Sequence, residues 1–219
     1  RRTASAVAKT VRDAPFDGAY RPESLSEVWT AVQACRRCDL WRDATQGVAG
    51  VGPARAALMF VGEQPGDQED LAGKPFIGPA GQLFDRALAE AEVPREETYV
   101  TNAVKHFKFE PRGKRRIHNT PNAGEVKACR WWLDNERRLV KPKLIVALGA
   151  TAAHSVLGRK SPVSQIRGRP LALEDGGRAF VTVHPSYMLR IPDAAEKARA
   201  YKLFVDDLAA AWQLVKAAA

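Results

Sequence analysis

Residues 57–67 read Ala57-Leu-Met-Phe-Val-Gly-Glu-Gln-Pro-Gly-Asp67, an apolar run that opens into a polar loop. The apolar part predicts a buried strand. Gly62 and Gly66 allow a sharp turn and a close approach of the backbone to a ligand, and Pro65 stiffens that turn. Open α/β sheets bind ligands at strand ends of this kind, although an ordinary strand-to-helix turn has the same pattern. The loop is therefore a candidate binding site that other segments must support.

The composition fits a single globular domain. The chain has 219 residues, of which 45% are hydrophobic and 27% are charged, and a chain of this length buries a core without disulfides. A formal net charge of +9 favours a polyanionic partner, but only weakly on its own. No segment reaches the roughly 20 apolar residues that span a bilayer, and residues 1–10 lack the apolar core of a signal peptide. We therefore expect a cytoplasmic protein with no membrane partner.

Apolar runs alternate with helical patterns along the chain. Residues 1–24 show no sustained periodicity and are predicted to be a loosely packed arm, followed by one domain over residues 25–219. Strands are expected at residues 57–61, 98–104, 144–148 and 179–183, with helices between them. This alternation predicts a three-layer α/β/α fold with a mostly parallel central sheet of about four strands.

Polar side chains stand at the ends of three of these strands. Glu63 and Gln64 follow the first strand, Asn102 belongs to the second and His184 follows the fourth. Because parallel strands end at the same edge of a sheet, these residues are expected to converge. Phe76, just downstream of the first strand, offers an aromatic face to a flat ligand, and an Asn amide can read a pyrimidine edge. The pattern predicts a pocket for a planar ligand, although a polar residue at a strand end often only satisfies the backbone.

Four short motifs resemble the iron–sulfur branch of the uracil-DNA glycosylase superfamily. They are Val61-Gly-Glu-Gln-Pro-Gly66, Thr101-Asn-Ala-Val104, Leu148-Gly-Ala-Thr-Ala-Ala153 and His184-Pro-Ser-Tyr-Met-Leu-Arg190. The resemblance covers the chain from about Cys35 to the closing helix. Each motif is short, and it is their combination that is specific.

The resemblance implies a role in uracil excision for each residue of the predicted pocket. Phe76 would stack on a uracil flipped out of DNA, Asn102 would read its edge, and Gln64 and Asp67 would add contacts, partly through their backbone. His184 would hydrogen-bond the uracil oxygen that gains negative charge as the bond to the sugar breaks. Hydrogen-bond donors held in place beside a developing anion lower the energy barrier to breaking this bond. Flipping is required because this bond is inaccessible inside a duplex.

The chain has three cysteines, two of them in the segment Cys35-Arg-Arg-Cys38. An odd number and a close spacing argue against disulfides and for a metal or redox role. The iron–sulfur branch uses four cysteines, and His106 stands where the third is expected. We infer a 4Fe-4S cluster held by Cys35, Cys38, His106 and Cys129, because imidazole can replace thiolate at iron. Zinc in a site of three cysteines and one histidine is the alternative, since the spacing fits both.

A long basic loop is predicted between Lys105 and Asn122. It has six lysines and arginines between Lys105 and Arg116, against one acid, Glu110. Such a cluster neutralises phosphates and makes binding depend on salt, although a charge run is often only a solvated surface. The side chains predicted to bind DNA are Lys114, Arg115 and Arg116 of this loop, together with Arg190 of the last motif.

The pentapeptide Lys114-Arg-Arg-Ile-His118 resembles the hallmark of X-type uracil-DNA glycosylases, which are related to the thermophile-type family 4 enzymes. The resemblance implies that His118 attacks the sugar C1′ once uracil has left, which leaves the protein attached to DNA. A neutral imidazole is a good nucleophile, and Glu63 is placed to orient it. The predicted function is single-turnover excision of uracil from single-stranded and double-stranded DNA, with free uracil as the product. We expect a monomer that acts on the DNA of the bacterial nucleoid.

Other functions fit parts of the same sequence. A conventional glycosylase would use water in place of His118 and turn over repeatedly. A metal-dependent nuclease would use Asp67, Glu69 and Asp70. A non-catalytic DNA-binding module would need only the basic loop.

Overall fold

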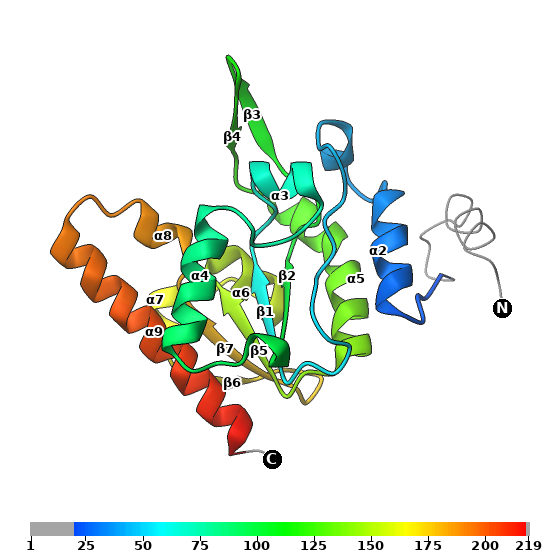
Figure 1. Ribbon diagram of the computed structural model, residues 1–219. Coiled ribbons are helices and arrows are strands. Elements are labelled where there is room, and N and C mark those ends of the chain that lie inside the picture. Colours follow the sequence, from blue (N-terminus) through cyan, green and yellow to red (C-terminus); the bar gives the residue numbers. More distant parts are fainter. Residues whose placement is uncertain (1–19, 218–219) are drawn as a thin grey trace.

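The predicted first strand, β1 (Leu58–Gly62), is buried along its whole length in the computed structural model, which describes residues 20–217. It pairs in parallel with β2 (Thr98–Asn102) on one side and with β5 (Leu144–Leu148) on the other. β5 pairs in parallel with β7 (Arg178–Thr182). Parallel strands need long crossover connections, and helices supply them here. The structure thus confirms the mostly parallel sheet (Figure 1).

A short edge strand, β6 (Pro170–Ala172), is one that the sequence patterns do not predict. It pairs antiparallel with β7. Within the described residues the sheet therefore has five strands, in the order β2-β1-β5-β7-β6, and the expectation of about four is one strand short. β6 is three residues long and exposed at both ends. Such a segment has no apolar run to detect, and its proline suits an edge position.

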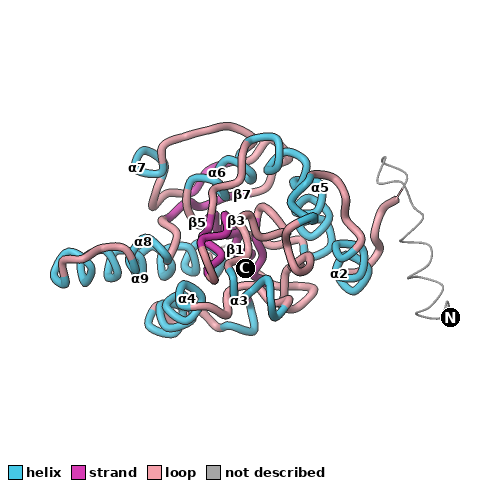
Figure 2. The backbone as a smooth tube through the Cα atoms, turned by 90° about the horizontal axis from the view of Figure 1, so that it is seen from above, coloured by secondary structure: helices cyan, strands magenta, loops and turns pink. Residues whose placement is uncertain are grey.

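Helices lie on both faces of the sheet (Figure 2). They are α2 (Leu25–Gln33), α3 (Asp67–Ala72), α4 (Pro79–Glu90), α5 (Ala123–Val140), α6 (Ala150–Leu157), α7 (Val163–Ile166), α8 (Ser186–Leu189) and α9 (Ala194–Lys216), with 3-10 turns η1 (Asp39–Arg42) and η2 (Arg95–Glu97). Side chains alternate along β1. Leu58 and Phe60 therefore pack on the face of α4 and α9, and Met59 and Val61 on the face of α5 and α6. The predicted three-layer α/β/α arrangement is confirmed.

The helices between residues 20 and 217 include none that is long and apolar enough to cross a membrane.

The end of the predicted N-terminal arm is packed where the structure describes it. Residues 1–19, most of that arm, lie outside the described residues. Tyr20 lies beside Trp131 of α5, with ring centroids 6.2 Å apart, and Pro22 is buried. Tyr20 and Pro22 are thus packed against the domain, whereas Arg21, Glu23 and Ser24 are exposed.

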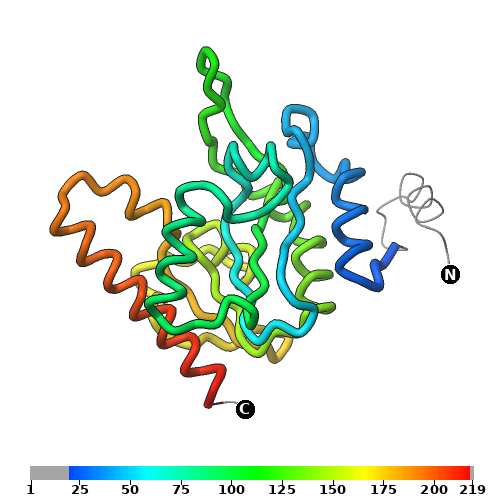
Figure 3. The backbone as a smooth tube through the Cα atoms, viewed as in Figure 1, coloured from blue at the N-terminus to red at the C-terminus, as the bar shows by residue number. Residues whose placement is uncertain are grey.

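The basic segment predicted as a loop contains a β-hairpin. β3 (Phe109–Arg112) and β4 (Arg115–His118) pair antiparallel, and Gly113 makes the turn between them with a φ of 59°. The hairpin projects beyond the carboxyl ends of the parallel strands (Figure 3). Its residues are mostly exposed and charged, so it lacks the apolar alternation that predicts a strand. The loop prediction is wrong for residues 109–112 and 115–118, which form strands.

Lys105, counted in the sequence among the cations that bind phosphate, is completely buried. Its ammonium group lies 2.7 Å from the carboxylate of Glu136 in α5, and neither side chain has any exposed surface. Lys105 therefore cannot belong to a DNA-binding surface. Only the tertiary structure brings these two residues together, because they are 31 positions apart in the sequence.

We expect Leu208→Ala to lower the free energy of unfolding by about 2–5 kcal/mol, because it leaves a cavity in the core. Leu208 is fully buried between α9 and the sheet. Leu203 on the same helix is 54% exposed, and Leu203→Ala should change the free energy by no more than about 0.5 kcal/mol. Denaturant unfolding of both variants measures the difference. Equal losses would contradict this assignment of the core face of α9.

Candidate active site

A cavity of about 690 Å³ lies at the carboxyl ends of the parallel strands. Seven of the residues predicted from the sequence line it: Glu63, Gln64, Phe76, Asn102, His118, His184 and Arg190. The structure thus brings together side chains from the loop after β1, the segment before α4, the end of β2, the loop after β7 and the hairpin. Asp67 is the one predicted uracil-binding residue that is not part of the lining.

The backbone at the end of β1 leaves room for Asn102 and Phe76, which the sequence predicts to face a planar ligand. A Cβ atom at Gly62 would lie 2.4 Å from Oδ1 of Asn102 and 2.7 Å from Cζ of Phe76. Contacts this short are not tolerated in folded proteins. Glycine at this position therefore lets the amide and the aromatic ring approach each other across the end of β1.

Glu69 holds the segment that carries Phe76. Its carboxylate accepts hydrogen bonds from the backbone N–H groups of Ile77 at 3.0 Å, Gly78 at 2.7 Å and Gly66 at 3.1 Å. Phe76 itself has a φ of 57°, which is unfavourable for a residue with a side chain. The clamp from Glu69 supports this conformation. In the sequence Glu69 is only a candidate metal ligand of a nuclease, and no local pattern marks it as a partner of these backbone groups.

His184 is arranged as a neutral hydrogen-bond donor. Its Nδ1 accepts the backbone N–H of Ser186 at 3.2 Å and lies 2.8 Å from the Ser186 hydroxyl. A backbone N–H can only donate, so in the neutral ring the proton is on Nε2. Burial lowers the pKa of His184 to about 4, although the nearby Glu63 carboxylate acts in the opposite direction. The ring is therefore neutral at physiological pH. The sequence does not single out Ser186, which lies inside the same motif.

Glu63 and His118 form a pair at the cavity. Nε2 of His118 lies 3.1 Å from Oε1 of Glu63, and the hydroxyl of Thr151 donates to the other carboxylate oxygen. Burial tends to raise the pKa of Glu63, but the hydrogen bonds from His118 and Thr151 prevail and hold it below its ordinary value. The His118 side chain is 49% exposed. A neutral His118 that donates to Glu63 keeps a lone pair on its other ring nitrogen.

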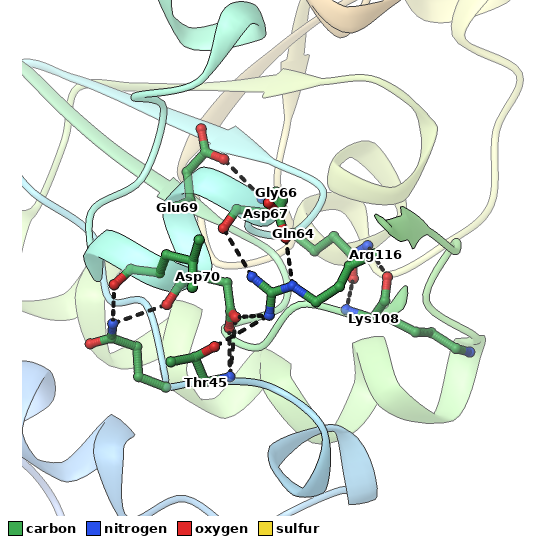
Figure 4. A network of polar contacts seen from close by, with 10 residues as sticks. Thr45, Gln64, Gly66, Asp67, Glu69, Asp70, Lys108 and Arg116 are labelled. Atoms are coloured by element: carbon green, nitrogen blue, oxygen red, sulfur yellow. Dashed lines mark hydrogen bonds and ion pairs between the residues drawn. The ribbon is translucent and has the colours of Figure 1, made fainter. Parts of the chain in front are cut away.

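Gln64 fastens the base of the hairpin instead of facing a ligand with its side chain (Figure 4). Its Oε1 accepts the N–H of Lys108 at 2.9 Å. Its Nε2 donates to the carbonyls of Lys108 at 3.1 Å and Asn119 at 3.0 Å. With the amide engaged in this way, the predicted uracil contact of Gln64 is left to its backbone.

Arg116 is bound to the protein itself, which corrects its assignment as a DNA-binding residue (Figure 4). Its guanidinium group pairs with Asp67 and lies 2.6 Å from Asp70, a residue with no exposed surface. The same pairing engages the Asp67 carboxylate, and Asp67 does not line the cavity. Lys114 and Arg115 at the tip of the hairpin and Arg190 at the cavity are exposed, as expected for phosphate-binding residues.

The three carboxylates of the alternative nuclease site are each engaged elsewhere. Asp67 and Asp70 pair with Arg116, while Glu69 accepts three backbone N–H groups. This arrangement does not favour a metal site built from them.

The three cysteines gather in one apolar cluster between α2 and α5. The indole N–H of Trp132 lies 3.1 Å from Sγ of Cys35, and the N–H of Lys105 lies 3.2 Å from Sγ of Cys129. Such donors stabilise thiolates around a metal centre, so the donor chemistry fits an iron–sulfur or zinc site. His106, the next residue after Lys105, is buried as well. As the side chains stand between residues 20 and 217, however, no group of three or more His, Cys, Asp or Glu residues is arranged to hold a metal ion.

Comparison with known proteins assigns the chain to a family. The family model described as "Uracil DNA glycosylase superfamily" matches residues 49–209. The chain belongs to this superfamily. A type-4 uracil-DNA glycosylase from Thermotoga maritima is 38% identical over 78% of this chain and 86% of its own length. A type-4 uracil-DNA glycosylase from Archaeoglobus fulgidus is 34% identical over 80% of this chain and 88% of its own. A type-5 uracil-DNA glycosylase from Pyrobaculum aerophilum is 28% identical over 72% of this chain and 73% of its own length.

Two neighbouring arginines of the hairpin are expected to respond differently to substitution. Arg116→Ala should lower the free energy of unfolding by about 1–3 kcal/mol, because it leaves the buried Asp70 carboxylate without its counter-ion and Arg116 is itself partly exposed. Arg115→Ala should leave stability unchanged and weaken DNA binding. The slope of the logarithm of the binding constant against the logarithm of the salt concentration should become smaller by about one. Denaturant unfolding and DNA titrations at several salt concentrations test this. The reverse pattern would contradict the assignment.

The stability of the protein should fall as the pH drops from 6.5 to about 4, in part through His184. In this window the unfolded chain binds a proton at this imidazole and the folded chain does not, so stability is lost as the pH falls. His184→Asn removes the titrating ring and keeps an acceptor for Ser186. Its unfolding free energy should therefore depend less steeply on pH. Identical slopes for the two proteins, measured by denaturant unfolding, would contradict the neutral state of His184.

Proposed function

We propose that this chain excises uracil from DNA and is then joined covalently to the vacated sugar through His118. Membership of the uracil DNA glycosylase superfamily supports the excision step, as do relatives named uracil-DNA glycosylases that are similar over most of their length. The observation that carries the second step is the pair formed by His118 and Glu63, with Nε2 and Oε1 3.1 Å apart at the wall of the cavity.

The residues that line the cavity support the excision step. A uracil flipped out of DNA would stack on Phe76, and the Asn102 amide would donate to and accept from its edge. Nε2–H of the neutral His184 would donate to the uracil oxygen on which negative charge develops. When the bond between base and sugar breaks, its electron pair leaves with uracil. The sugar is left as an electron-poor oxocarbenium ion.

The position of His118 at the cavity supports capture of the sugar. A ring nitrogen of the neutral imidazole gives its lone pair to C1′, and the ring becomes a cation. Glu63 accepts a hydrogen bond from the other ring nitrogen and offsets this positive charge. The uracil anion takes a proton from solvent. The new carbon–nitrogen bond is not readily hydrolysed, so the reaction ends after one turnover.

The hairpin and Arg190 would hold the DNA strand. Lys114 and Arg115 are exposed at the hairpin tip, and Arg190 donates to the Ser186 hydroxyl at 3.1 Å beside the cavity. These cations are placed to neutralise phosphates on either side of the flipped nucleotide. Single-stranded DNA suffices as a substrate for such a surface, and a duplex would need to open locally.

We further propose that Cys35, Cys38, His106 and Cys129 hold a 4Fe-4S cluster, with zinc as the alternative. Support comes from the three neighbouring cysteines, of which Cys35 and Cys129 are buried, and from the N–H donors directed at these two. When bound, the metal cluster would link Cys35 and Cys38, which follow α2, to Cys129 in α5. It would take no part in breaking the sugar–base bond. Visible absorbance together with iron, sulfide and zinc analysis of the purified protein separates the alternatives.

A denaturing gel tests the proposed function. Incubation with a uracil-containing single-stranded oligonucleotide should give a band of protein and DNA that survives boiling in detergent. His118→Ser should abolish this band but still release free uracil, because water then takes the place of the imidazole. His154→Ser, a histidine of α6 outside the cavity lining, serves as the matched control and should form the band normally.

Other outcomes of this experiment would support the alternative functions. Release of uracil by the native protein without a stable band would support a conventional glycosylase that uses water. Salt-reversible binding without release of uracil would support a simple DNA-binding module.

A further inference from the structure

Lys105 is a buried charge for which the reaction outlined above has no use. Its ammonium group makes three hydrogen bonds: to Oε2 of Glu136 at 2.7 Å, to the hydroxyl of Thr101 at 2.7 Å and to the carbonyl of Asn102 at 2.8 Å. These partners come from α5 and from the last two residues of β2. The ammonium group therefore joins the end of β2 to the helix behind it.

Glu136 completes this network from the side of α5. Besides Lys105, its carboxylate accepts the hydroxyl of Thr101 at 2.8 Å, the hydroxyl of Tyr99 at 3.3 Å and the backbone N–H of Gly50 at 2.8 Å. Each polar group of this buried cluster thus has a partner. The cluster is built as a rigid unit behind β2, on the side of the sheet away from α4 and α9.

The position of the Asn102 side chain depends on its backbone. Among residues 20–217 this side chain has no hydrogen-bond partner, and its amide faces the cavity. Gly62 leaves space for it but does not hold it. The carbonyl of Asn102 is held by Lys105, and the next residue, Ala103, donates to the carbonyl of Gly62 at 2.8 Å.

Stability alone is a poor explanation for this ion pair. Both side chains are completely buried, so each charge has lost its hydration. Replacement of such a pair by uncharged groups of similar volume is often neutral or stabilising. Buried ionic groups more reliably specify one arrangement of the chain, and here the arrangement in question includes a residue of the uracil pocket.

We propose that Lys105, with Glu136 as its counter-ion, is a positioning residue that holds Asn102 in place to read uracil. Lys105 touches no part of the cavity and acts through the Asn102 carbonyl. This inference rests on the proposed function, because it assumes that the Asn102 amide reads the base. It predicts that the ion pair matters for recognition of uracil more than for folding.

The double variant Lys105→Met/Glu136→Gln tests this, because it removes both charges and nearly keeps their volume. We expect its unfolding midpoint to stay close to that of the native chain. The single-turnover rate of uracil excision should fall by about ten-fold to a hundred-fold, as expected for a misplaced contact. Binding to uracil-free DNA should be unchanged. The exposed pair on α9 supplies the control Lys202→Met/Asp206→Asn, which should change neither rate nor stability.

A cycle with Asn102→Ala separates positioning from a general loosening of the fold. If Lys105 acts through Asn102, the double variant should cause almost no further loss of excision rate once Asn102 is alanine. Losses that multiply independently would overturn the inference, and so would native excision by the double variant. Should that variant not fold, Lys105→Met/Glu136→Met provides a second, apolar pair, and failure of both to fold assigns the ion pair to stability and overturns the inference.

The native chain, measured alongside, distinguishes this inference from the proposed function. A native chain that releases no uracil refutes the function itself. A native chain that releases uracil at the same rate as the double variant refutes only the role of Lys105.

Discussion

Parallel pairing of β1 with β2 and β5 is the constraint on which the site depends. It places the ends of these strands at one edge, where Glu63, Asn102 and His184 meet although more than a hundred residues of chain lie between the first and the last. Glycine at the end of β1 then allows the side chains to approach each other. The fold thus supplies a preformed polar pocket, and its loops only complete it.

The hairpin makes this pocket different from a plain strand-end crevice. Backbone pairing between its two strands does not by itself hold it against the domain, because the strands are short and mostly exposed. The Gln64 amide at its base and the pairing of Arg116 with the buried Asp70 fix it in place. Arg116 and His118 are two residues apart on β4 and therefore share a face. Anchoring of the first thus brings the second towards Glu63.

Buried charges organise the pocket from two directions. Asp70 lies beneath the hairpin, and the pair of Lys105 and Glu136 lies behind β2. Neither is needed to fill a hydrophobic core. In both cases a charge without hydration binds main-chain groups as well as its counter-ion, which restricts the local backbone to one arrangement. A site that must hold a base and a nucleophile at fixed positions benefits from this restriction.

The sequence by itself determined the layered fold, the strands that are long and apolar, and the polar residues at their ends. Hydrophobic periodicity and the alternation of strands with helices can both be read along the chain. It also marked the motifs of the superfamily. Only the tertiary structure decided what each charged residue does. Arg116 and Lys105 look like phosphate-binding cations in a basic run, yet both pair with acids far away in the sequence. The hairpin and the edge strand β6 could not be predicted from the sequence for a related reason. Their pairing depends on neighbouring strands and not on an apolar pattern of their own.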